Sequence, residues 1–192
     1  MPGGRLGLEL TGNILRRRTG SATEGPSSGS ERVGMDLYFL RHGIAGQRAE
    51  WEGDDSERPL SGPGREEITR VAAAIAKLGL SLDAIVTSPY ARALQTAEIV
   101  AQHLNMQDKL VTEDRLVPGF GIDKLAKLLK AYPDASALML VGHEPDFSAT
   151  VNGLTGGTIV LKKGGMAYVR VAYPLLKKAE LVWLVPPALL GL

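Results

Sequence analysis

Two kinds of hydrophobic pattern alternate along the chain. Short runs of consecutive apolar residues, typical of strands buried on both faces, cover residues 37–40, 84–86 and 137–141. Segments in which apolar residues recur at helical spacing cover about residues 62–78, 91–104 and 122–132. This alternation predicts an α/β fold, a three-layer α/β/α sandwich with a mostly parallel central sheet.

Capping and breaking residues indicate where these elements begin and end. Ser61, followed by Gly-Pro-Gly, predicts the start of the first helix, and Gly79 predicts its end. For the second helix we expect Ser88 as the N-cap and Pro89 at the first helical position. A Pro-Pro pair after residue 185 is expected to end the fold. Further strands are expected over residues 109–112, 166–173 and 180–185, the last two as edge strands, with an antiparallel direction open for one of them.

Basic side chains are expected at one edge of this sheet. The first apolar run ends in Arg41 and His42, and the run that ends at Val141 is followed two positions later by His143. Ligands of open α/β sheets bind beyond the carboxyl ends of the strands, where these groups suit a small anion. Arg92 lies in the first turn of the second helix, where a guanidinium is unfavourable unless an anion is present. The alternatives are packing histidines and a solvated surface arginine.

The connection between the first strand and the first helix is a further candidate. Residues 44–60 form a segment of about 17 residues, longer than usual connections and rich in charged side chains, among them Asp55 and Arg58. Its length and charge predict a functional loop.

His42, His143 and a carboxylate could also bind zinc, because three protein ligands suffice at a catalytic zinc site. Two nearby arginines would repel a dication and instead favour a phosphate, which guanidinium groups bind bidentately. We therefore expect phosphate binding and no metal. The third histidine, His103, lies near the end of a helix and is given no functional role.

Composition narrows the class of protein. The chain of 192 residues suits one domain, and its 44% hydrophobic and 22% charged residues are values of a globular protein. A net charge of +1 gives no support to nucleic-acid or membrane-surface binding. The absence of cysteine excludes disulfides and thiolate metal sites and fits a cytoplasmic protein. No stretch of about 18 consecutive apolar residues occurs, so no transmembrane helix is expected.

Residues 1–34 differ in kind from the rest. They hold 8 of the 23 glycines and no aromatic residue, which predicts a disordered N-terminal tail ahead of a domain over residues 35–192. The tail's apolar stretch is weak and interrupted by glycine, which does not match a secretory signal peptide. Because Met35 directly precedes the first strand, an alternative is that the native chain begins there.

Three ordered segments resemble the signatures of the histidine phosphatase superfamily, which has the phosphoglycerate mutase-like fold. They are Leu40-Arg41-His42-Gly43, the segment TSPYARALQTA at residues 87–97, and Val141-Gly142-His143. The compact length from residue 35 and the segment Arg58-Pro59-Leu60-Ser61 most resemble its SixA-type phosphohistidine phosphatases. The likeness covers residues 35–185.

The resemblance implies roles for these residues. Neutral His42 would be the nucleophile and would form a phosphohistidine intermediate that water hydrolyses. Arg41, Arg92 and His143 would bind the phosphoryl oxygens, and Arg58 would be the further arginine of a SixA-type pocket. Neither a metal nor another cofactor is implied.

The general acid is less well defined. Many superfamily members place a glutamate on the loop after the third strand, where Arg115 is the best match in this chain. Asp55 is our first candidate for the acid and Glu113 the second. A weak or missing acid favours a phosphoramidate substrate, because an imidazole leaving group has a pKa of about 6.5 and leaves readily once protonated.

Three functions follow from these observations. The first is a phosphohistidine phosphatase acting on a signalling or phosphotransfer protein, which the short chain favours because it leaves little room for walls around a small substrate. The second is a small-molecule phosphomonoesterase or mutase of the same superfamily, and the third a non-catalytic phosphate-binding module. We expect a phosphohistidine-bearing protein or a small phosphomonoester as partner, no nucleic acid, no membrane, and a monomer or weak dimer.

Overall fold

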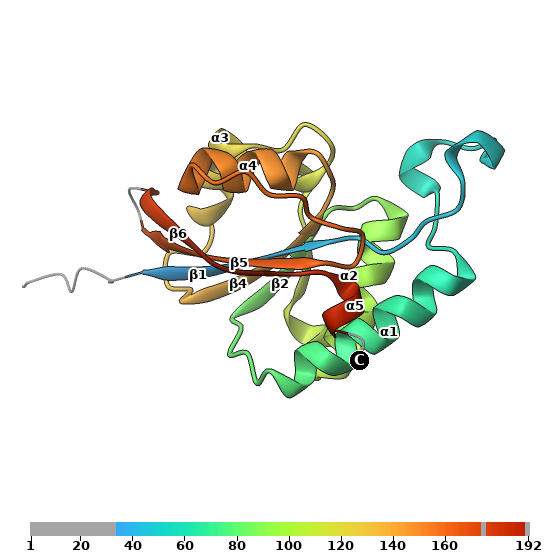
Figure 1. Cartoon of the computed structure of the whole chain (residues 1–192), viewed down its shortest axis with the longest axis horizontal. Coiled ribbons are helices and arrows are strands. Elements are labelled where there is room, and N and C mark those ends of the chain that lie inside the picture. The colour runs from blue at the N-terminus through green and yellow to red at the C-terminus, as the bar shows by residue number, and fades with distance from the viewer. Residues whose placement is uncertain (1–33, 174–175, 191–192) are drawn as a thin grey trace, which may run out of the picture. The chain divides into compact units, whose positions relative to one another are not determined.

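The computed structural model describes residues 34–173 and 176–190 (Figure 1). The expected disordered tail, residues 1–34, lies outside the described residues except for Gly34, so the tail and the domain boundary at residue 35 stay predictions. In the described ranges, no helix is long and apolar enough to cross a membrane.

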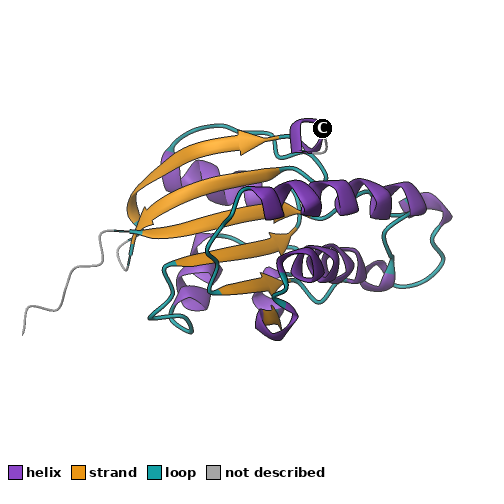
Figure 2. Cartoon of the chain, turned by 90° about the horizontal axis from the view of Figure 1, so that it is seen from below, coloured by secondary structure: helices purple, strands orange, loops and turns teal. Residues whose placement is uncertain are grey.

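One sheet of six strands forms the centre of the fold (Figure 2). Its strands are β1 Met35–Arg41, β2 Ala84–Thr87, β3 Leu110–Thr112, β4 Ala137–Gly142, β5 Met166–Ala172 and β6 Lys177–Val185. They lie in the order β3-β2-β4-β1-β5-β6. The first four run parallel, whereas β5 is antiparallel to β1, and β6 to β5. The α/β fold class and the mostly parallel sheet are confirmed.

Helices cover both faces of the sheet. They are α1 Gly62–Lys77, α2 Ala91–Leu104, α3 Ile122–Leu129, α4 Asp146–Thr155 and α5 Pro187–Leu190. Figure 1 shows α3 and α4 on one face and α1, α2 and α5 on the other, which confirms the three layers. The Ser61 side chain caps α1 by accepting a hydrogen bond of 3.1 Å from the backbone N–H of Gly64, as expected.

The core explains why the β1 sequence is one continuous apolar run. Phe39 faces α3 and α4 and meets Phe147 edge-on, with ring centroids 5.2 Å apart. Tyr38 faces the other side and stacks on Tyr168 at 4.7 Å. Both faces of β1 are therefore buried, as in a central parallel strand.

The C-terminal part differs from expectation in two ways. The strand expected at an edge over residues 166–173 lies inside the sheet, between β1 and β6. Of the last two strands, β5 runs antiparallel to β1, and β6, being antiparallel to β5, runs in the direction of β1, in agreement with the antiparallel direction left open for one of them. All but one of the first six β5 residues are buried, the exception being Arg170, which pairs with Asp36 of β1. The chain also continues past the prolines into α5, whose Leu190 is 7% exposed and packs against the core.

Candidate active site

The carboxyl ends of β1 and β4 bring two histidines together. In the parallel ladder Arg41 lies opposite Gly142, and the backbone N–H of His42 donates to the Gly142 carbonyl at 3.1 Å. The rings of His42 and His143 then lie with centroids 5.2 Å apart. The sequence places both at strand ends, and the pairing of β1 with β4 makes them neighbours.

His42 is buried and is held in one tautomer. Its side chain is directed by a hydrogen bond of 2.7 Å from Nδ1 to the Gly43 carbonyl, and a carbonyl only accepts, so Nδ1 carries the proton. Nε2 is thus left with its lone pair. Burial, together with the positive charges of Arg92 and Arg41, lowers the pKa of His42 to about 3. The ring is neutral at pH 7 and has a nucleophilic nitrogen.

His143 has an unexpected partner in Ser88. Its Nε2 lies 2.9 Å from the Ser88 hydroxyl oxygen, which also accepts a 3.3 Å hydrogen bond from the backbone N–H of Tyr90. Burial and the charge of Arg92 lower the pKa of His143 to about 4. When the Ser88 hydroxyl donates to Nε2, Nδ1 carries the ring proton and can donate to an anion.

The expected role of Ser88 as the N-cap of the second helix is wrong. The helix begins at Ala91, with Tyr90 in the N-cap position, so Pro89 precedes the helix as well. The physical reason is the sheet, because the Ser88 backbone N–H donates to the Val141 carbonyl at 3.0 Å and holds the residue at the end of β2.

Two arginines contribute to the same region, Arg92 from a buried side chain and Arg41 from a half-buried one. Arg92 is the second residue of α2, as expected, and is 5% exposed. Its Nη1 and Nη2 donate to the backbone and side chain of Asp55, at 2.7 and 3.1 Å. Arg41 donates through Nη1 to the Leu161 carbonyl at 2.9 Å. The positive charges of both arginines help to lower the pKa of His42.

These donors are incompletely satisfied. In the described part of the chain, five buried side-chain polar atoms have no hydrogen-bond partner, and three of them are Arg41 Nε, Arg92 Nε and His143 Nδ1. Buried hydrogen-bond donors are normally paired. Three site atoms without a partner therefore indicate that an acceptor belongs in this region. An oxyanion with several oxygens can accept from all three.

The loop over residues 44–60 contains two short 3-10 helices and a bridge between Ala45 and Leu60, and it reaches this region through Asp55. The backbone N–H of Leu60 donates to the Gln95 side chain of α2 at 2.9 Å. Asp55 accepts from Arg58 Nε at 2.9 Å as well as from Arg92. The structure thus brings Arg58 and Asp55 together beside Arg92.

Both candidates for the general acid are paired with arginine. Burial would raise the pKa of Asp55, but the hydrogen bond from Arg58 and the charge of Arg92 outweigh it and hold this pKa below its usual value. Glu113 accepts from Arg115 at 2.7 Å. The lowered pKa makes Asp55 a weak proton donor at neutral pH.

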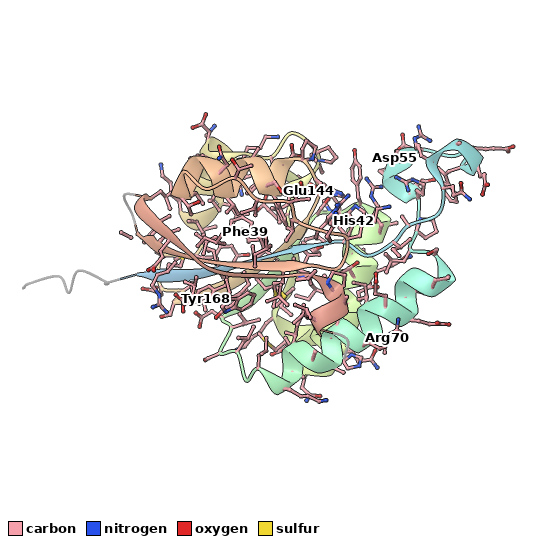
Figure 3. All side chains as sticks on the ribbon, viewed as in Figure 1. Phe39, His42, Asp55, Arg70, Glu144 and Tyr168 are labelled. Atoms are coloured by element: carbon pink, nitrogen blue, oxygen red, sulfur yellow. The ribbon has the colours of Figure 1, made fainter. Side chains whose placement is uncertain are left out.

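Glu144 is a site residue that the sequence reasoning missed. It directly follows His143 in the chain, and this position could have identified it from the sequence. Burial lowers the pKa of Arg41, and the negative charge of Glu144 opposes this shift. Its Oε1 accepts a hydrogen bond of 3.1 Å from the backbone N–H of Ser148 in α4. Figure 3 shows Glu144, His42 and Asp55 at the same end of the sheet.

The zinc alternative would need a carboxylate beside the two histidines. Within residues 34–173 and 176–190, no three His, Cys, Asp or Glu side chains are grouped so that they could hold a metal ion. His103, which was given no functional role, lies in α2 with Nδ1 at 2.8 Å from the Ile99 carbonyl one turn earlier.

Stability should depend on pH through the two buried histidines. In the unfolded chain each titrates near pH 6.5, whereas the folded pKa values are about 3 for His42 and about 4 for His143. Between these values the unfolded state binds more protons, so acid favours unfolding. We expect the free energy of unfolding to fall by about 2 kcal/mol for each ring between pH 7 and pH 5.

Urea unfolding at a series of pH values measures this effect. The variant His42→Gln lacks one of the titrating rings, so its free energy of unfolding should fall less steeply over the same interval. Equal slopes for the two proteins would show that His42 is not held neutral by the fold.

The sequence matches the model of one protein family and several individual proteins. The family model of the histidine phosphatase superfamily (branch 1) matches residues 37–118. An uncharacterized protein of Picosynechococcus is 40% identical over 143 residues, which are 71% of this chain and 85% of that protein. The phosphohistidine phosphatase SixA of Escherichia coli is 26% identical over 113 residues, 58% of this chain and 68% of SixA.

A solved structure extends the likeness to the fold. The protein histidine phosphatase SixA complexed with tungstate superposes with a TM-score of 0.72 at 23% identity, covering 81% of this chain and 99% of that chain. The two proteins share the phosphoglycerate mutase-like fold.

Proposed function

Because the chain belongs to the histidine phosphatase superfamily, we propose that it is a phosphohistidine phosphatase, which removes the phosphoryl group from phosphohistidine on a signalling or phosphotransfer protein. The observation that carries the proposal is a neutral, buried His42 beside three buried donors that have no partner. A phosphoryl group supplies both an electrophile for the ring and acceptors for the donors.

The reaction has two steps. In the first, Nε2 of His42 forms a bond to phosphorus while the bond from phosphorus to the substrate imidazole breaks, and that imidazole leaves with a proton. In the second, water attacks phosphorus, the bond to Nε2 breaks, and phosphate is released. The ring returns to its starting tautomer because Nδ1 keeps its hydrogen bond to Gly43 throughout.

Positive charge stabilises both transition states. Arg41, Arg92 and Arg58 carry permanent charges, and His143 can donate a hydrogen bond from Nδ1. Hydrogen bonds of this kind strengthen as negative charge develops on the equatorial oxygens. The proposal needs no metal and no other cofactor.

Phosphohistidine and phosphomonoesters differ in the group that leaves from phosphorus, which is an imidazole in the first and an alkoxide in the second. An alkoxide needs a strong acid to leave, and both candidate acids, Asp55 and Glu113, are tied to arginines. An imidazole has a pKa of about 6.5 and obtains its proton from water or a weak acid at neutral pH. This comparison favours a phosphoramidate over a small-molecule ester as substrate.

The test is kcat/KM for one phosphohistidine-bearing protein beside a panel of sugar and nucleotide monoesters. We expect a clear preference for the phosphoprotein, which disappears in His42→Ala. Preference for one small ester would instead identify a small-molecule phosphatase or mutase. No turnover of any substrate, with phosphate still bound, would identify a non-catalytic phosphate-binding module.

A further inference from the structure

One carboxylate lies between two arginines of the proposed phosphate site. Asp55 accepts from Arg92 Nη2 through Oδ2 at 3.1 Å and from Arg58 Nε through Oδ1 at 2.9 Å, and its backbone carbonyl accepts from Arg92 Nη1 at 2.7 Å. Its side chain is 33% exposed, whereas those of Arg92 and Arg58 are 6% and 14% exposed. On its outer side Asp55 also pairs with Arg48, whose Nε lies 3.4 Å from Oδ1 and whose side chain is 62% exposed. Asp55 therefore lies between the exposed Arg48 and the two less exposed arginines.

The contacts with Asp55 occupy only one edge of the Arg92 guanidinium. A guanidinium has five N–H donors, and here the edge formed by Nη1 and Nη2 is turned toward Asp55. Nε is buried without a partner, so the edge formed by Nε and Nη2 remains available. That edge can bind two phosphoryl oxygens at once.

The carboxylate also separates two like charges. Besides burial, the charge of Arg58 lowers the pKa of Arg92, so the two guanidinium groups repel each other at short range. Asp55 attracts both. Arg58 is held further by its Nη1, which donates to the Gly46 carbonyl at 2.6 Å within the same loop.

We propose that Asp55 is a positioning residue, which orients Arg92 and Arg58 to receive the phosphoryl group, in place of the proton-donor role expected from the sequence. The inference rests on the proposed function in taking a phosphoryl group as the ligand of these donors. The alternative, that Asp55 occupies the phosphate position and must be displaced, does not account for the donors left free on Arg92, Arg41 and His143 while Asp55 is in place.

Binding of inorganic phosphate, measured by isothermal titration calorimetry, tests the inference without any turnover. Asp55→Asn should weaken phosphate binding by roughly 10- to 100-fold, because Arg92 and Arg58 lose their fixed orientation. Asp54→Asn is the matched control. Asp54 immediately precedes Asp55, and the hydrogen bonds that its side chain accepts come from the backbone N–H and the hydroxyl of Ser56. It should bind phosphate within about twofold of the native protein. Unchanged or tighter phosphate binding by Asp55→Asn would overturn the inference.

The leaving-group dependence of hydrolysis separates positioning from proton donation. Over a series of aryl phosphates, loss of a positioning residue lowers kcat/KM by the same factor for each ester, whereas loss of a general acid costs most with the poorest leaving group. We expect a uniform loss in Asp55→Asn, and a smaller one in Asp55→Glu, which keeps the charge. A loss that grows with leaving-group pKa would assign Asp55 as the acid.

The two proposals fail in different ways. If the native protein hydrolyses neither the phosphoprotein nor any ester, the proposed function is wrong, while the phosphate titrations of Asp55→Asn and Asp54→Asn still decide the role of Asp55. Thermal unfolding of each variant shows that a lost affinity does not come from a lost fold.

Discussion

Replacing His42 by alanine is expected to lower kcat for the phosphohistidine protein by about 10⁴-fold or more. Both His42 and His143 are buried and neutral at pH 7, but Nε2 of His143 lies against the Ser88 hydroxyl, whereas the hydrogen bond from Nδ1 of His42 to Gly43 leaves the Nε2 lone pair of His42 for the substrate. Without it no covalent intermediate forms, and water would have to attack the substrate directly.

Rapid-quench labelling with a phosphohistidine substrate measures this prediction most directly. The native protein should carry an acid-labile, base-stable phosphoryl group in the steady state, and His42→Ala should carry none. His103→Ala is the matched control, because this histidine bonds only to the Ile99 carbonyl within its own helix. Activity within tenfold of the native value in His42→Ala would exclude a nucleophilic role.

Replacing Arg92 by alanine is expected to lower kcat/KM by about 10²- to 10³-fold, through loss of charge stabilisation in the transition state. Arg92 is 5% exposed, presents an unpaired Nε, and contributes positive charge next to both histidines. Arg92→Lys should recover little of the loss. A lysine has one ammonium group and cannot contact Asp55 with two donors while a third nitrogen faces the substrate.

Arg70→Lys and Arg70→Ala provide the controls for Arg92, since Arg70 is exposed on α1 and stands away from His42 in Figure 3. Both should keep kcat/KM within about twofold of the native value. If Arg92→Lys were as active as the native protein, charge alone would suffice and the bidentate geometry would be unnecessary.

Whether Asp55 acts as a positioning residue or as a general acid affects which substrates the site favours. If Asp55 orients arginines, the site has no strong acid among the two candidates taken from the sequence, and good leaving groups are favoured. Glu144, whose charge acts on Arg41, is then the next carboxylate to examine for a role in proton transfer. Substitution of Glu144 belongs in the same leaving-group series as Asp55→Asn.

Local patterns in the sequence predict the strands, the principal helices and the residues that follow the strand ends. Apolar runs report burial on both faces, and a strand has a direction, so the amino-acid order alone assigns Arg41, His42 and His143 to the carboxyl edge of the sheet. The Ser61 cap and the place of Arg92 in the first turn of its helix follow from equally local rules.

Features that depend on which segments are neighbours cannot be predicted from such local patterns. Periodicity says that a strand is buried but not which strand it pairs with. The sequence therefore left the pairing of β1 with β4 open and wrongly put β5 at an edge of the sheet. Ser88 looked like a helix cap because capping rules are local, yet it is held at the sheet and bonds to His143. The contacts of Asp55 with Arg92 likewise join residues far apart in the chain, and such contacts exist only once the loop has folded onto α2.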